Sequence, residues 1–138
     1  MNRSTIRITL AATTFAALAV SGTLLAQNTG LTRTVVAKAD VSVAGREAVL
    51  TRTEIATGGS VGWHTHPGDE ISYVKEGDVE LAVAGRPVRV LKSGEGFIIP
   101  AGAVHAAKNA GSAAVKLSSV YYVEKDKPMA TPAPAPAP

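Results

Sequence analysis

The three histidines of the chain, His64, His66 and His105, lie in two short glycine-rich segments. Side chains two residues apart on a strand point to the same face, about 7 Å apart, so His64 and His66 would face the same way. Glu70 follows after a Pro-Gly pair that can fold the next strand back alongside the first. Two imidazoles and a carboxylate are the ligand set of an open-sided transition-metal site, and His105 could supply a fourth donor. We therefore expect His64, His66 and Glu70 to face one divalent metal ion, with His105 as the candidate fourth donor.

The spacing of these residues resembles that of the cupins, which carry two motifs. The first is Gly, five residues, His-any-His, three or four residues, Glu, six residues and Gly, and it is matched by Gly58, His64, His66, Glu70 and Gly77. The second is Gly, five residues, Pro-any-Gly, two residues, His, three residues and Asn, and it is matched by Gly94, Pro100, Gly102, His105 and Asn109. The resemblance covers about residues 33–123. It implies a small antiparallel β-barrel with a divalent metal on His64, His66, Glu70 and His105, but no single reaction.

The absence of cysteine limits the chemistry of the metal site. Only nitrogen and oxygen ligands remain, and no disulfide can stabilise the fold. Three histidines and one carboxylate on an octahedral ion leave two positions for water, oxygen or substrate. That geometry suits Fe(II), Mn(II), Ni(II) or Co(II), while Zn(II) or Cu(II) would fill the site by affinity alone.

Residues 1–26 have the layout of a secretory signal peptide. Arg3 and Arg7 form a positive start, an apolar stretch follows over residues 8–20, and Ala26 is a small residue before a cut at Gln27. This predicts a periplasmic or secreted protein, with an uncleaved membrane anchor as the alternative. Without the two leader arginines the chain has 12 basic and 11 acidic residues. These charges are scattered, so nucleic acid is not an expected partner.

The remainder reads as one domain of short strands. Turn signals recur every eight to twelve residues and no amphipathic helix is evident, which favours an all-β sandwich or barrel. We expect a flexible linker at residues 27–32, a jelly-roll-like antiparallel barrel at 33–125, and a disordered tail at 126–138 because alternating alanine and proline cannot pack a core.

Strand alternation also predicts the surroundings of the metal. Gly62, Ser72 and Val74 should share the inward face with the ligands, whereas Asp69 should turn to the rim. Candidates for the remaining apolar lining or core are Leu81, Val83, Val90, Phe97 and Ile99. Either Tyr121 or Tyr122 could reach the mouth of the pocket. Residues expected outside, where they could form a homodimer contact, are Trp63, Tyr73 and Tyr122.

Three functions remain open on the sequence alone. The first is a small metal-dependent, dioxygenase-like oxidoreductase that binds an oxygenated small molecule. The second is a non-catalytic module that binds metal and a small ligand. The third is a metal-dependent isomerase, lyase or decarboxylase, which would need an acid-base partner that the sequence does not reveal. A membrane would be a partner only through an uncleaved leader.

Overall fold

The computed structural model describes residues 28–137, and its regular elements are all β-strands. The strands are β1 (Thr29–Asp40), β2 (Arg46–Thr65), β3 (Gly68–Glu76), β4 (Val79–Val83), β5 (Arg89–Leu91), β6 (Gly96–Ile99), β7 (His105–Asn109), β8 (Val115–Glu124) and β9 (Thr131–Pro132). Within residues 28–137 no helix has the length and apolarity needed to cross a membrane. The predicted signal peptide lies outside the described residues.

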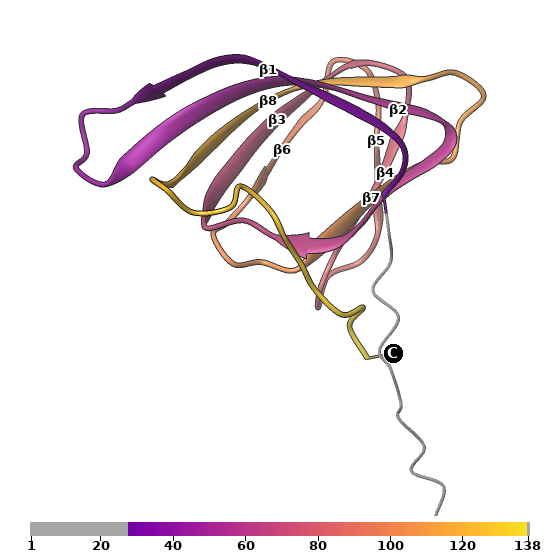
Figure 1. The fold of residues 1–138 in the computed structure, drawn as a ribbon. Helices are drawn as coiled ribbons and strands as arrows, with labels where there is room; N and C mark the ends of the chain where they lie inside the picture. The colour runs from indigo at the N-terminus through magenta and orange to yellow at the C-terminus, as the bar shows by residue number, and fades with distance from the viewer. Residues whose placement is uncertain (1–27, 138) are drawn as a thin grey trace, which may run out of the picture.

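The 20-residue strand β2 organises the sheet. Its first half pairs with β8, its last residues pair with β7, and both β1 and β9 also attach to it. The hydrogen-bonded order is β5-β4-β7-β2-β8-β3-β6, and the pairings are antiparallel. The strands curve around a common interior (Figure 1). The predicted all-β antiparallel barrel is therefore confirmed.

Alternation along β2 and β3 explains which face they bury. In the first half of β2, Val49, Thr51, Thr53 and Ile55 are buried and the residues between them are more exposed. The same period of two buries Glu70, Ser72 and Val74 in β3. A period of two puts successive side chains on opposite faces of a sheet, so one face of each strand is committed to the interior.

Two apolar clusters fill the interior. The smaller one contains Val49, Tyr121 and Val123, with Met129 packed against it. The larger one contains Ile55, Val61, Val74, Val79, Leu81, Leu91, Phe97, Ile99, Val115 and Leu117. Burying a side chain of this size stabilises a fold by roughly 1.5–3 kcal/mol. These clusters hold together a chain that has no disulfide.

Glycine is required at two points beside β8. A Cβ on Gly68 would lie 2.0 Å from the carbonyl oxygen of Tyr122, so a side chain there would push β3 away from β8. Gly77 has a φ of 76°, and a Cβ there would lie 2.7 Å from the carbonyl oxygen of Ala114. Only glycine adopts that conformation without strain.

The strand boundaries differ from the prediction at the N-terminal end of the barrel. Residues 29–32, expected in a flexible linker, belong to β1, and Leu31 packs against the larger cluster. β1 pairs with β2 from Thr29 onward, with a shift of register between Thr29 and Leu31. Pairing with a long partner strand therefore orders this segment.

The expected disorder of the C-terminal tail is wrong for its first part. Thr131 and Pro132 form β9 against the end of β2, and the amide of Ala133 donates to the carbonyl oxygen of Trp63 at 2.9 Å. Ala133 is buried and Met129 packs on the smaller cluster. Proline is tolerated in an edge strand because its missing N–H faces no partner there. The chain from residue 126 to 133 is thus part of the barrel.

Candidate metal centre

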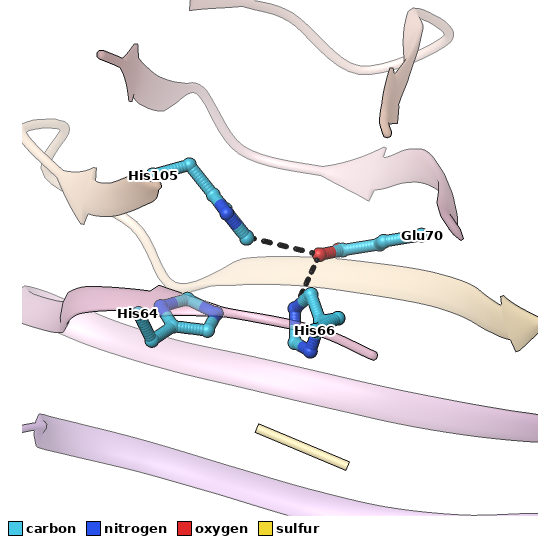
Figure 2. Close-up of side chains that lie close together, drawn as sticks. All are labelled: His64, His66, Glu70 and His105. Carbon is cyan, nitrogen blue, oxygen red and sulfur yellow. Dashed lines mark hydrogen bonds and ion pairs between the residues drawn. The ribbon is translucent and has the colours of Figure 1, made fainter. Parts of the chain in front are cut away.

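The four predicted ligands come together inside the barrel. His64 lies at the end of β2, His66 follows that strand, Glu70 belongs to β3 and His105 begins β7. All four are buried, and one ligand atom from each lies within 4.8 Å of the others. Figure 2 shows the three imidazoles and the carboxylate pointing toward one another. The sequence prediction of this cluster is confirmed as a possible metal site.

Strand pairing and loop hydrogen bonds fix these positions. His64 pairs directly with His105 across β2 and β7. The carbonyl oxygen of His66 accepts the amide of Gly102 at 3.0 Å, which joins the corner of the second motif to the first. The carboxylate of Asp69 accepts the amide of Ala101 at 2.9 Å and is exposed, as expected of a rim residue.

A shift of register lies between Val61 and His64 in β2. Val61 and His64 are three positions apart, which in a regular strand would place them on opposite faces. Both line the interior because the irregularity between them reverses the alternation of side chains. Gly62 is buried beside this irregularity, and its amide donates to the side-chain oxygen of Asn28 at 2.9 Å. Ser72 and Val74 are buried on the inward face of β3, as predicted.

Each imidazole is held through the same nitrogen. The Nδ1 of His64 lies 2.7 Å from the carbonyl oxygen of Gly62, that of His66 lies 2.5 Å from the carbonyl oxygen of Met129, and that of His105 lies 2.9 Å from the carbonyl oxygen of Ala103. A carbonyl oxygen only accepts, so each Nδ1 must carry the hydrogen. In the neutral ring, Nε2 then keeps a free lone pair. This is the tautomer in which a histidine binds a metal.

Glu70 is oriented by a pair of serines that link β3 to β8. Ser72 donates to Oε1 of Glu70 at 2.6 Å, and the hydroxyls of Ser72 and Ser119 lie 2.6 Å apart. The other oxygen, Oε2, lies 3.1 Å from Nε2 of His66 and 3.3 Å from Nε2 of His105. Ser119 was not singled out from the sequence, although its place in the alternation of β8 puts it on the inward face.

With neutral imidazoles, the cluster contains no positive charge to balance the carboxylate of Glu70. The Nε2 atoms of neutral His66 and His105 and the oxygen of Glu70 are all acceptors, and Nε2 of His105 is buried without a hydrogen-bond partner. Three lone pairs and a carboxylate oxygen so close together repel one another unless a cation lies between them. The donor set therefore fits a divalent transition metal, which would be held by His64, His66, Glu70 and His105.

The pKa values favour the ligand forms of two residues. Burial would raise the pKa of Glu70, but the neighbouring imidazoles of His105 and His66, which stabilise the carboxylate whenever they carry a second proton, and the hydroxyl of Ser72 outweigh it and lower that pKa below its ordinary value. Burial, aided by the nearness of a second imidazole at His105, lowers the pKa of His64 to about 4. Near neutral pH the carboxylate is therefore ionised and the imidazole of His64 is neutral, as metal binding requires.

A small cavity adjoins the ligands. Its volume is about 20 Å³, room for roughly one or two water molecules. Besides three of the ligands, its wall consists of Arg33, Thr53, Val61, Leu81, Phe97, Ala107, Leu117 and Tyr121. Leu81 and Phe97 thus line the cavity as predicted, and Tyr121 rather than Tyr122 reaches it. Arg33 and Thr53 were not predicted.

The other lining candidates lie elsewhere. Ile99 is buried in the larger cluster and Val83 packs against it, so both belong to the core. Val90 is 58% exposed, because β5 turns its neighbour Leu91 inward at 1% exposure. The prediction for Val90 is wrong by one position, which is enough to reverse the face of a strand.

An open-sided cluster of nitrogen and oxygen ligands inside an antiparallel barrel is the arrangement typical of metal-binding β-barrel proteins. The model of the cupin domain matches residues 51–121 of this chain. The chain therefore belongs to the cupin family.

Similar proteins agree with that assignment. A germin-like protein of Morus alba is 36% identical over 84 residues, which is 57% of this chain and 38% of that protein. Among solved structures, a conserved protein with a double-stranded β-helix domain from Klebsiella pneumoniae has a TM-score of 0.63, with 23% identity over 82% of this chain and 92% of that one. An oxalate oxidase in complex with the substrate analogue glycolate has a TM-score of 0.59, with 25% identity over 74% of this chain and 54% of that one. The chain spans well under half the length of the germin-like protein.

Proposed function

We propose that this cupin is a metal-dependent, dioxygenase-like oxidoreductase that uses molecular oxygen to oxidise a small oxygenated acid. The observation that carries the proposal is the convergence of three Nε2 lone pairs and one carboxylate oxygen beside a small cavity. When bound, a divalent transition metal with four protein ligands offers two open positions and redox or Lewis-acid chemistry. The similarity to an oxalate oxidase and a germin-like protein supports this reading.

The protein residues around the cavity are suited to binding rather than to proton transfer. Apart from the ligands, Arg33 and Tyr121 are the titratable groups in its wall. Burial, with the negative charge of Glu70, raises the pKa of Tyr121 to about 12, so the phenol stays protonated near neutral pH. No residue of this wall other than a ligand can act as a general base, which disfavours the isomerase, lyase and decarboxylase alternatives.

Oxygen uptake tests the proposal. Protein loaded separately with Fe(II), Mn(II), Ni(II) or Cu(II) would be incubated with oxalate, glycolate and other short hydroxy acids in an oxygen electrode. We expect uptake with at least one metal and acid, little uptake in Glu70→Gln, and unchanged uptake in Asp69→Asn, whose charge change is the same. Tight metal retention without oxygen uptake would instead support the non-catalytic binding module, which the small cavity also suits.

We also propose that the protein is exported. The leader predicted at residues 1–26 would deliver the chain to the periplasm or the exterior, where it would acquire its metal. N-terminal sequencing of protein recovered from that compartment should begin at Gln27, whereas a start at Met1 would contradict cleavage.

We also propose a homodimer that forms through the outer face of the sheet. Leu50, Val120, Ile71 and Ile98 lie side by side across β2, β8, β3 and β6. Ile71 and Ile98 are 48% and 63% exposed, and neighbouring Tyr73 is exposed as well. A contiguous apolar row of this kind is typical of a protein contact. Light scattering should give a dimer for the parent protein. Ile98→Lys should dissociate this dimer, whereas Val43→Lys, in the β1–β2 turn, should not. A monomeric parent protein would contradict the proposed dimer.

A further inference from the structure

We propose that Arg33 forms an anion subsite beside the metal centre, so that the ligand of this cupin is a short carboxylate held between the ion and the guanidinium. The inference rests on the proposed metal-dependent function and assigns the chemical class of its ligand. It concerns a residue outside both histidine motifs.

Arg33 is fixed at the wall of the cavity. It pairs with Thr53 across β1 and β2, and its Nε donates to the hydroxyl of Thr53 at 3.5 Å. Its guanidinium carbon lies 5.5 Å from the centre of the Tyr121 ring. Stacking on an aromatic face orients a guanidinium and leaves its edge free for hydrogen bonds. The ring of Tyr121 in turn lies 4.8 Å from that of His66, which connects Arg33 to the ligand cluster.

The charge of Arg33 is uncompensated within residues 28–137. The ion pairs of this range join lysines or histidines to carboxylates, and none includes Arg33. Glu70 is the carboxylate in the same cavity wall, but it forms no ion pair with Arg33, accepts from Ser72 and is a proposed ligand of the metal. One of the five guanidinium donors contacts Thr53, so four remain for a ligand.

The size and polarity of the cavity restrict that ligand. Its volume of about 20 Å³ excludes an aromatic ring, and its lining includes the apolar side chains of Val61, Leu81 and Phe97. A guanidinium edge binds a carboxylate through two parallel hydrogen bonds. A two- or three-carbon acid meets the charge of the guanidinium with little bulk, whereas a neutral ligand would leave the guanidinium unused.

Calorimetric titration of the metal-loaded full chain with glycolate, and with the neutral glycolamide, tests the subsite. We expect Arg33→Gln to weaken glycolate binding at least tenfold and Arg33→Lys to weaken it by a smaller factor. Arg52→Gln is the matched control, because Arg52 is exposed on β2 and its loss changes the net charge equally. Glycolamide binding should be the same in all four proteins. Metal content, measured by elemental analysis, should not change.

The outcomes separate this inference from the proposed function. Failure of the parent protein to take up any metal would overturn both. Metal uptake without glycolate binding, or glycolate binding that Arg33→Gln leaves unchanged, would overturn the anion subsite alone. If Arg33→Gln does not fold, Arg33→Lys decides, since glycolate affinity equal to that of the parent protein would show that the guanidinium does not hold the carboxylate.

Discussion

His66 donates its Nδ1 hydrogen to the carbonyl oxygen of Met129, which lies 63 residues further along the chain, at 2.5 Å. A metal-ligating histidine is oriented by the partner of its other nitrogen, and loss of such partners typically costs ten- to a hundredfold in metal affinity. The segment after β8 therefore contributes to the candidate metal centre, although it follows both histidine motifs.

Removal of residues 126–138 should weaken metal binding by about ten- to a hundredfold, because His66 loses the acceptor that fixes its tautomer. Competition with a chelator of known affinity measures the change. Removal of residues 134–138 is the control, since Pro134 to Ala137 are exposed. Met129→Ala keeps the carbonyl and should retain most of the affinity. Equal affinity in both truncated chains would contradict the role of Met129.

Glu70→Gln should reduce metal affinity at least a hundredfold, because a neutral amide neither cancels the charge of the ion nor accepts from Ser72 as strongly. Metal content after dialysis and the metal-dependent rise in melting temperature are the measurements. Asp69→Asn should behave as the parent protein because Asp69 lies at the rim and contacts Ala101. Full metal retention by Glu70→Gln would show that the cluster does not bind metal through this carboxylate.

Three of the four proposed ligands could be predicted from sequence because their placement depends on local rules. The spacing of His64 and His66 places both on one face of a strand, and the Pro-Gly corner brings Glu70 back beside them. His105 required the family motif, since nothing local indicates that β7 pairs with the end of β2. Strand content and the absence of helices in residues 28–137 followed from alternation and turn residues.

The missed features depend on long-range pairing. The irregularity between Val61 and His64, across which both residues line the interior, lies where β2 pairs with β7 rather than β8, and this change of partner leaves no mark on composition. The Ala-Pro composition after residue 129 predicts disorder, yet β9 forms because the end of β2 offers it a free edge. Arg33 lines the cavity because β1 lies against β2, and a local sequence pattern does not reveal which strands become neighbours.

The stability of the metal-free fold should fall in mild acid. The pKa of His64 is lowered from 6.5 to about 4, so between these values the unfolded chain binds a proton that the folded one does not. Stability is therefore full above pH 6.5 and declines by up to about 3 kcal/mol as the pH approaches 4. Urea unfolding of chelator-treated protein across this window measures it. His64→Gln lacks the titration and should decline less, and an equal decline would assign the effect to other groups.

Asn109, the last residue of the second motif, should be needed for stability and not for metal binding. It is fully buried at the opposite end of β7 from His105, and its amide donates to the carbonyl oxygens of Ile55 at 2.9 Å and Ala113 at 2.8 Å. Asn109→Leu leaves both acceptors without this donor, at a cost of roughly 1–3 kcal/mol for each group that stays buried. Urea unfolding should show that loss, whereas the exposed neighbour Lys108→Ala should show almost none. Metal affinity, measured where the variant is still folded, should change less than twofold; selective loss of metal at unchanged stability would instead place Asn109 in the site.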